Sequence, residues 1–297
     1  MTTIAFFGAT GGCANACLTY TLLHGYNARA LARTPSKLTA LLLSQPDITP
    51  EILSHQLEII EGDARDVESI MKTLIINSTP KSAPNSACTL VTSIISGLGG
   101  APTIAFTKEP KCAKTHIRIP ALPHIQLSNP HITEQTTSAL LQALAKIASD
   151  RFTSFEKYRA VAPRVTVIST MGHLPGNKDV PFWFRPMYSV LLPIPHADKL
   201  QMEKLFDKEI ALGNAGVLAA GVVVVRPSFF TGDHLVSVFE GERRGEGMGL
   251  EKVRVGTEKA PAIGYTISRA LVGEWIFKEI VKGGGGKWVG EKVTITT

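Results

Sequence analysis

The chain has 297 residues, of which 44% are hydrophobic and 19% are charged, with a formal net charge of +6 at pH 7. This is the composition of a soluble globular protein with a sizeable core. No apolar run reaches the ~18 to 20 residues of a membrane span. The first residues, MTTIAFF, lack the basic segment of a secretion signal. We therefore expect a cytoplasmic protein with no membrane partner.

Positive charge is scattered along the sequence. The densest basic stretch, KEPKCAKTH at 108–116, is short, contains a proline and has no stacking aromatic residue. A nucleic-acid surface gathers its charge along one face, so we expect no nucleic-acid partner. The four cysteines, at 13, 17, 88 and 112, have the spacing of neither a metal site nor a disulfide framework. Reduced thiols and no metal are the simplest interpretation.

Apolar runs alternate with segments of helical character from the first residues onward. The predicted strands span 3–7, 28–32, 57–60, 88–95, 164–169 and 221–225. The predicted helices span 13–24, 36–43, 67–76 and 133–148. Strands separated by helices of this length predict an α/β fold with a doubly wound parallel sheet. We expect one domain over 1–297, with a small C-terminal part that binds substrate.

Two long segments, 97–131 and 171–195, contain five prolines each and show no clear period. Both follow predicted strands, so both are expected at the carboxyl edge of the sheet, where such folds bind ligands. Together with 229–262 they are candidate insertions around a substrate pocket. The second contains PFWFRPMY at 181–188, which either packs the loop down or forms a wall for a flat apolar substrate. A glycine run at 283–286 predicts a turn before a last short strand.

A glycine-rich stretch, GATGG at 8–12, lies between the first predicted strand and the first predicted helix. Gly8, Gly11 and Ala14 have the spacing G-x-x-G-x-x-A. In this context Gly8 permits a tight turn, Gly11 and Gly12 let a pyrophosphate approach the main chain, and Ala14 allows close helix–strand packing. The helix N-terminus offers free N–H groups to the phosphates. The alternative is a sharp turn without a ligand.

Basic residues follow the second predicted strand, where NAD-binding sheets usually place an acid for the ribose 2′-hydroxyl. Here the chain has Arg33 and Lys37, and no carboxylate precedes Asp47. A guanidinium suits a 2′-phosphate, so the sequence favours NADP(H) over NAD. The alternative is a solvated arginine at the start of a surface helix.

Acidic residues follow the third predicted strand in EGDARD at 61–66. Asp63 is a candidate acceptor for the adenine amino group, with Ala64 contributing backbone contacts. Alternatively, Asp63 or Asp66 caps the helix that follows, and the two roles are compatible.

Five motifs occur in a familiar order: GATGG at 8–12, ALARTPSKL at 30–38, EGDARD at 61–66, VVVVRPS at 222–228 and ISRALVGEWIF at 267–277. Together they resemble the NAD(P)-binding, NmrA-like branch of the atypical short-chain dehydrogenases, which includes the flavin and biliverdin reductase type. The resemblance covers nearly the whole chain apart from the two proline-rich segments.

This resemblance implies a Rossmann sheet of six or seven strands, NADPH on the glycine loop and a substrate pocket built by the later loops. Carried over by position, the residues that line the cofactor are Gly8, Thr10, Gly11, Gly12, Cys13, Arg33, Asp63 and Ala64. Those around the nicotinamide are Ile94, Ser169, Thr170, Ser228 and Phe229. Many fungal relatives act on small aromatic metabolites, and others sense the redox state of the cofactor without turnover.

One departure concerns the acid catalyst. Short-chain dehydrogenases commonly protonate substrate with a tyrosine activated by a lysine four positions later. None of the five tyrosines, at 20, 26, 158, 188 and 265, has a lysine at that spacing. Lys199 is present in the corresponding region, but Pro195 stands four positions before it.

Other residues are therefore candidates for the proton transfer to the substrate. Lys199 flanks the apolar face of its predicted helix, so it either leans toward the cofactor ribose or forms a surface ion pair with Glu203. Candidate proton donors are Tyr188, His173 and His196. For Cys13, at a helix N-terminus, we favour a packing or phosphate-adjacent role over redox reactivity.

The sequence thus favours an NADPH-dependent oxidoreductase that reduces a small aromatic or polyketide-like quinone or ketone, with a place in secondary metabolism. The first alternative is a regulator that binds NADP(H) without turnover. The second is a non-redox enzyme, such as an isomerase or cyclase, that retains NADP. The missing Tyr–Lys pair favours the alternatives, whereas the long loops and the aromatic segment favour the oxidoreductase.

Overall fold

A computed structural model describes residues 2–77, 88–100, 102–106, 123–173, 178–236 and 249–297. Its centre is an eight-stranded sheet in the order β12-β14-β10-β9-β6-β1-β2-β3. Seven neighbouring strands are parallel, and β12 pairs antiparallel with β14 at one edge. The strands are β1 (Thr3–Phe7), β2 (Asn27–Ala32), β3 (Leu57–Glu61), β6 (Ser93–Ser96), β9 (Arg164–Ile168), β10 (Val222–Pro227), β12 (Arg254–Thr257) and β14 (Lys292–Thr296).

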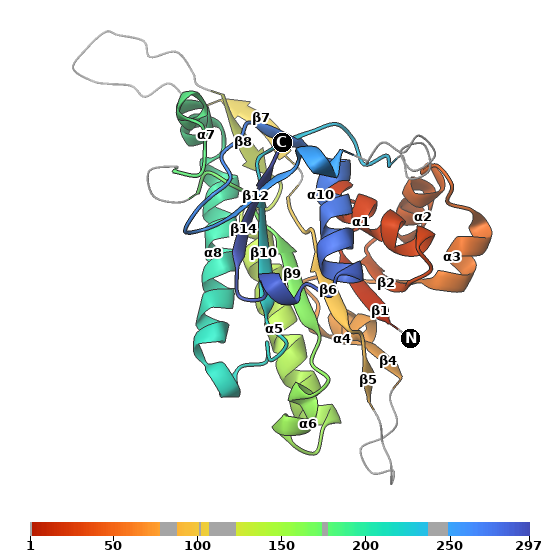
Figure 1. The fold of residues 1–297 in the computed structure, drawn as a ribbon. Coiled ribbons are helices and arrows are strands. Elements are labelled where there is room, and N and C mark those ends of the chain that lie inside the picture. Colours follow the sequence, from red (N-terminus) through yellow and green to blue (C-terminus); the bar gives the residue numbers. More distant parts are fainter. Residues whose placement is uncertain (1, 78–87, 101, 107–122, 174–177, 237–248) are drawn as a thin grey trace.

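Helices cover both faces of this sheet (Figure 1). One face carries α1 (Gly12–Leu23), α2 (Pro35–Leu43), α3 (Pro50–Gln56) and α10 (Arg269–Ile276), which continues as a π-helix over Phe277–Lys282. The other carries α4 (Val67–Leu74), α5 (Ile132–Arg151), α6 (Phe155–Arg159) and α8 (Pro193–Ala211). The predicted doubly wound α/β fold is confirmed.

Side-chain alternation along the central strands builds two separate cores. Val223 and Val225 of β10 pack under α1 and α10, whereas Val222 and Val224 face α5 and α8. Successive side chains of a strand point to opposite faces, so a strand covered on both sides must be apolar throughout. The unbroken VVVV run of β10 is the direct consequence.

Two predicted elements end differently in the structure. The strand predicted over 88–95 is divided, because Thr89–Leu90 (β5) pairs antiparallel with Ile75–Asn77 (β4) and only β6 enters the main sheet. The break is held by Val91, whose N–H bonds the carbonyl of Leu74. The helix predicted over 67–76 correspondingly ends at Leu74, where the β-branched Ile75 and Ile76 adopt an extended conformation.

The long proline-rich segments contain regular structure that the sequence pattern did not reveal. Pro102–Phe106 (β7) and Pro123–Leu127 (β8) form an antiparallel pair. The 171–195 segment includes a 3-10 turn at Phe182–Phe184 and the helix α7 (Arg185–Leu191). A further pair, Phe229–Thr231 (β11) with Thr266–Ser268 (β13), is parallel. The KEPKCAKTH stretch, with Cys112, lies outside the described residues.

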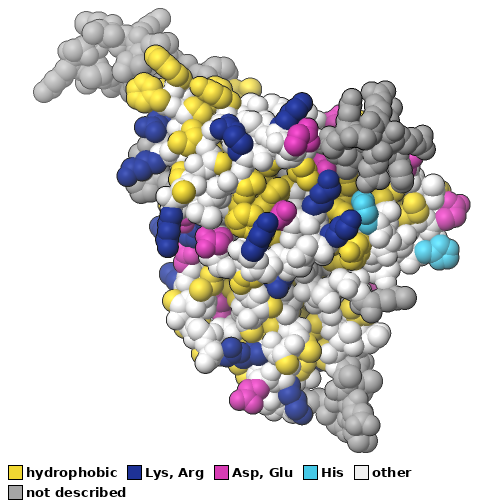
Figure 2. All heavy atoms as spheres, viewed as in Figure 1, with side chains coloured by type: hydrophobic (Ala, Val, Ile, Leu, Met, Phe, Trp, Pro, Cys, Tyr) yellow, Lys and Arg dark blue, Asp and Glu magenta, His cyan; other side chains and the backbone are white. Residues whose placement is uncertain are grey.

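Short turns complete the described chain at Gly213–Ala215, Leu250–Lys252 and Gly286–Trp288. The predicted turn before the last strand is present, with Gly284 and Gly285 at positive φ. On the face shown in Figure 2, Lys and Arg side chains are dispersed, while apolar side chains gather at the end where β7, β8 and α7 lie. None of the described helices combines the length and hydropathy needed to cross a bilayer.

Candidate cofactor and substrate site

The glycine loop makes its tight turn as the spacing predicts. Gly8 has a φ of 74°, and the Gly11 N–H bonds the Gly8 carbonyl at 2.8 Å. A Cβ on Gly8 would lie 2.9 Å from the backbone of Gly97, and a Cβ on Gly97 would lie 2.7 Å from the Cβ of Ala14. Such separations leave no room for a side chain at either glycine. The loop therefore lies directly against the end of β6.

A buried amide pair holds this loop in place. The Asn15 amide donates to the carbonyl of Ala9 at 2.9 Å, and its own oxygen accepts from the Gln45 amide at 2.8 Å. Gln45 also donates to the carbonyl of His234 and accepts from the N–H of Val236. Gln45 thereby ties the start of α1 to the segment that follows β11.

A cleft of about 390 Å³ opens beside the glycine loop at the carboxyl ends of β1, β2 and β3. Seven residues chosen from the sequence line it: Gly8, Thr10, Gly11, Arg33, Lys37, Asp63 and Ala64. They come from three separate strand ends, which the parallel sheet brings to one edge. The rest of the lining is formed by Leu31, Ala32, Gly62, Gly97, Leu98, Gly99, Gly100, Ile132 and Thr136.

The basic residues of the cleft are exposed. Arg33 and Lys37 form no ion pair with any residue that the structure describes. Asp63 bonds Arg65 at 2.8 Å, and the Arg65 hydrogen bond is the main cause that holds the pKa of Asp63 below its usual value. Asp66 is the residue that caps α4, accepting from the N–H groups of Glu68 and Ser69. The two acids thus have separate roles.

The SGLGG sequence at 96–100 supplies a wall of the cleft that was not predicted from the sequence. Gly97, Gly99 and Gly100 line the cleft together with Leu98. The available signal was a second glycine cluster directly after a predicted strand, since glycines there allow close backbone approach.

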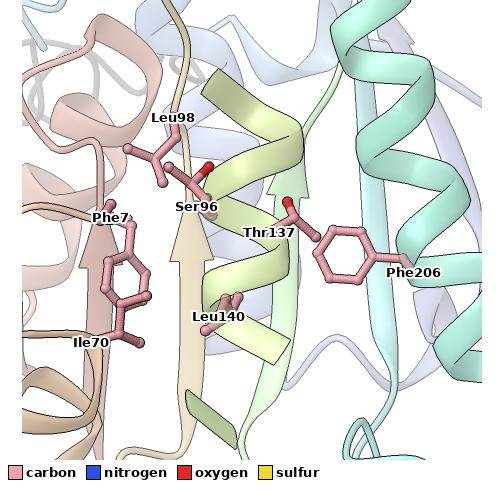
Figure 3. Close-up of a pocket in the computed structure, with 9 residues that line it drawn as sticks. Phe7, Ile70, Ser96, Leu98, Thr137, Leu140 and Phe206 are labelled. Carbon is pink, nitrogen blue, oxygen red and sulfur yellow. The ribbon is translucent and has the colours of Figure 1, made fainter. Parts of the chain in front are cut away.

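A small cavity of about 10 Å³ lies between the sheet and the helices behind this wall. Figure 3 shows Phe7, Ser96 and Leu98 on its sheet side, with Thr137 and Leu140 of α5 and Phe206 of α8 opposite. It is at most large enough for a single water molecule. The cavity is a packing gap and not a ligand site.

Lys199 of α8 reaches the carboxyl ends of two neighbouring strands. Its Nζ donates to the carbonyl of Ile168, the last residue of β9, at 2.7 Å and to that of Leu98, beyond β6, at 3.0 Å. Burial lowers the pKa of Lys199 to about 8, although the charges of Asp198 and Glu203 act in the opposite direction. Of the two predicted environments, the surface ion pair with Glu203 is not formed.

Glu203 is instead the centre of a buried charge cluster. It accepts from Ser169 Oγ at 2.5 Å and from the Arg226 guanidinium through both Nε and Nη2. His173 Nε2 lies 3.3 Å and Lys292 Nζ 3.7 Å from its carboxylate. Burial acts to raise the pKa of Glu203, but the adjacent His173 and the hydrogen-bonded Arg226 hold it well below its usual range. This cluster fixes the ends of β9, β10 and β14 against α8.

The three candidate proton donors lie together beside this cluster. The Tyr188 ring centroid is 5.7 Å from that of His196, which is 6.4 Å from that of His173. Burial and the charge of Asp179 raise the pKa of Tyr188 to about 12. Burial and the charge of His173 lower the pKa of His196 to about 4. At pH 7 the phenol is protonated and the His196 imidazole is neutral.

Four other predicted site residues are not among those that line the cleft: Ile94, Ser169, Thr170 and Ser228. Ile94 is fully buried inside β6 and packs in the core, so the strand end is formed by 96–98 instead. Ser169 is engaged by Glu203, and Ser228 bonds Thr296. Thr170 bonds the carbonyl of Met171 at the end of β9.

Cys13 and Gly12, at the start of α1, are both enclosed by neighbouring groups. Burial raises the pKa of Cys13 to about 12, so its thiol stays protonated, in line with a packing role. The open side of Gly12 is filled by the methylene groups of Arg269.

The aromatic segment 181–188 divides into outward and inward side chains. Phe182 and Trp183 are 69% and 81% exposed. Phe184 lies 4.9 Å from Tyr265 and 6.5 Å from Tyr188, measured between ring centroids. Tyr188 in turn meets Phe229. The inward rings pack the segment down, as the first interpretation expects, and the wall for a flat substrate stays a prediction.

A scan of family models finds no match for this chain. The chain is 44% identical to "Oxidase pynE" of Aspergillus niger, covering 99% of this chain and 98% of that protein. It is 35% identical to "Reductase pytE" of Aspergillus terreus, covering 99% and 97%. Among solved structures, a wide-type short-chain dehydrogenase/reductase of Veillonella parvula in complex with NADP matches with a TM-score of 0.59 at 13% identity, covering 100% of this chain and 94% of that one.

The structural match supports the Rossmann-like α/β fold. The sequence similarity to the two Aspergillus proteins extends over 99% of this chain. With this identity and coverage, the chain belongs to the family of fungal oxidoreductases that contains Oxidase pynE and Reductase pytE.

Proposed function

We propose that this chain is an NADPH-dependent oxidoreductase of the NmrA-like type that reduces a small aromatic or polyketide-like quinone or ketone. The observation that carries the proposal is the cleft, which is lined both by the glycine loop and by two exposed cations, Arg33 and Lys37. The names of the two Aspergillus relatives, an oxidase and a reductase, support an oxidoreductase and give opposite directions of electron transfer.

The residues present fit a dinucleotide. The Gly8–Gly97 approach leaves the main chain of the loop without side chains, which suits a pyrophosphate. Arg33 and Lys37 would hold the 2′-phosphate, and Asp63 with Ala64 would border the adenine. Ser169, Thr170, Ser228 and Phe229 would border the nicotinamide end. The cofactor supplies a hydride to the substrate when bound.

The chain's own groups would supply the proton. Tyr188 and His173 remain the candidate donors, because the lowered pKa of His196 leaves its imidazole neutral at pH 7. Tyr188 carries its proton throughout the neutral range. Lys199 would place a positive charge at the ends of β6 and β9, beside the cofactor ribose. A quinone or flavin acceptor needs little acid assistance, which suits a chain without a Tyr-x-x-x-Lys sequence.

An apolar wall would hold the substrate. Phe184, Tyr188, Phe229 and Tyr265 form a connected set of aromatic rings around the loop after β9. Such rings bind flat aromatic molecules by stacking and edge contacts. This arrangement favours an aromatic substrate.

Calorimetry with NADPH and NADH tests the cofactor assignment. The wild-type chain should bind NADPH at least tenfold more tightly than NADH. Arg33→Ala should weaken NADPH about 10- to 100-fold, the equivalent of one charge-assisted contact, and leave NADH unchanged. Arg159→Ala, which removes an arginine of the distant helix α6, is the matched control. Equal affinity of the wild type for both dinucleotides would contradict the proposal.

A turnover screen tests the enzyme assignment. NADPH oxidation should be followed with quinones, flavins and aromatic ketones, and the reverse reaction with NADP and the reduced compounds. Tight NADPH binding without turnover in either direction would favour the regulator or the non-redox enzyme over the oxidoreductase.

A further inference from the structure

The helices α1 and α10 lie side by side and run in the same direction (Figure 1). A Cβ on Gly12 would lie 2.3 Å from Arg269 Cδ, and a Cβ on Gly273 would lie 2.5 Å from the Cβ of Ala16. The second contact lies four residues further along both helices, so their N-termini meet at the same edge of the sheet. The positive ends of two helix dipoles therefore add at the glycine loop.

The two helices do not offset this positive end within their own first turns. The first turns of α1 and α10 contain no Asp or Glu, and the first residue of α10 is Arg269 itself. A cation at a helix N-terminus is electrostatically unfavourable unless an anion is nearby. Arg269 forms no ion pair with the described residues; its Nη1 donates to the carbonyl of Gly232, and its guanidinium lies 5.4 Å from the Phe230 ring.

The absence of a side chain at position 12 has its explanation here. The methylene groups of Arg269 fill the space that a Cβ of residue 12 would occupy. The sequence suggested that Gly12 is small to admit a pyrophosphate, whereas in the structure its open side admits Arg269. The packing fixes the stem of Arg269 against Gly12 at the start of α1, and Gly12 directly follows Gly11, which lines the cleft.

We propose that Arg269 binds the dinucleotide pyrophosphate between the N-termini of α1 and α10. This rests on the proposed function and adds a second anchor to it, with Arg33 and Lys37 at the 2′-phosphate. A guanidinium has five N–H donors, so it can bind a phosphate oxygen while Nη1 keeps the Gly232 carbonyl. Arg269 would thereby also hold the segment after β11 beside the bound cofactor.

Three ligands separate the two anchors: NADPH, adenosine 2′,5′-bisphosphate and adenosine 2′-monophosphate, which lacks the 5′-phosphate. Arg269→Gln should weaken the first two about 10- to 100-fold and change the third by less than twofold. Arg33→Gln should weaken all three. Arg269→Lys keeps the charge without the planar fork and should recover part of the affinity. Arg159→Gln should change none of them.

The outcomes are distinguishable. If the wild type binds NADPH and Arg269→Gln binds it with the same affinity, the role of Arg269 is overturned and the proposed function remains intact. A wild-type chain that binds no dinucleotide overturns both. Circular dichroism checks that each variant is folded. If Arg269→Gln does not fold, Arg269→Lys is measured in its place and should bind the two ligands with a 5′-phosphate about threefold or more weakly than the wild type. Unchanged affinity of Arg269→Lys for these two ligands would contradict the proposal.

Discussion

Lys199 Nζ lies 2.7 Å from the carbonyl oxygen of Ile168, at the end of a central strand. Its burial lowers its pKa from 10.5 to about 8, so between these pH values the unfolded chain binds more protons than the folded one. By linkage, this group's contribution to stability rises with pH across that window.

We therefore expect the free energy of unfolding of the wild type, relative to Lys199→Met, to rise between pH 8 and 10.5. The slope is at most about 1.4 kcal/mol per pH unit. Urea titrations of both proteins at several pH values measure the difference, in which the other titrating groups cancel. If the free energies of unfolding of the two proteins change with pH in the same way, the pKa of Lys199 is not lowered in the folded chain.

The buried pair of Glu203 and Arg226 predicts a large effect of neutralising the acid. Glu203→Gln removes the buried carboxylate that Arg226 contacts through two nitrogens and leaves it only Glu258, a half-exposed acid 3.5 Å from Nη1. We expect this to cost about 3 kcal/mol of stability. The control is Glu68→Gln, because Glu68 pairs with Lys146 on the surface and both side chains are about half exposed. That change should cost less than about 1 kcal/mol. Similar urea midpoints for the two variants would contradict the assignment.

Two glycines in the SGLGG sequence predict opposite outcomes for the same substitution. Gly97→Ala brings a methyl group 2.7 Å from the Cβ of Ala14, so α1 and the end of β6 must separate. The expected loss of stability is about 1–3 kcal/mol, accompanied by weaker NADPH binding. Gly99→Ala meets no atom within 4 Å and should be nearly neutral in stability. Thermal unfolding and calorimetry of both variants measure the contrast; equal effects would count against close packing at Gly97.

The divided aromatic segment makes a prediction about substrate binding. Phe184→Ala removes a ring that contacts Tyr188 and Tyr265, and should raise KM for an aromatic substrate about tenfold. Trp183→Ala removes a ring that is 81% exposed and should leave KM unchanged. Steady-state kinetics with one active quinone or ketone compares them. A larger effect at Trp183 would place the substrate on the outer side of the segment.

Much of the fold was predictable from the sequence, because it depends on residues that are close together in the chain. The unbroken valine run of β10 requires burial on both faces, and the glycines at 8 and 11 specify a tight turn before a helix. These signals need only the period of the side chains and the steric limits of the backbone. The division of the predicted 88–95 strand was not predictable in this way. Its apolar residues suit both the main sheet and the small β4–β5 pair, and which of the two forms depends on the partner strand.

The candidate site shows the same division between local and long-range causes. Sequence position alone brought Arg33, Lys37 and Asp63 into one cleft, since the ends of neighbouring parallel strands share an edge. The partners of Glu203 and Arg269 were not predictable. Glu203 is four residues from Lys199 on the helix, yet it pairs with Arg226 of another element.

The sequence by itself determined the α/β class, the glycine loop and the basic residues after the second strand, because each follows from neighbours within a few positions. Only the tertiary structure decided which charges are buried, which rings face the site and that the N-termini of α1 and α10 coincide. The physical reason is that burial and charge pairing depend on which residues the packed sheet and helices bring together across the chain, and spacing along the sequence does not specify that.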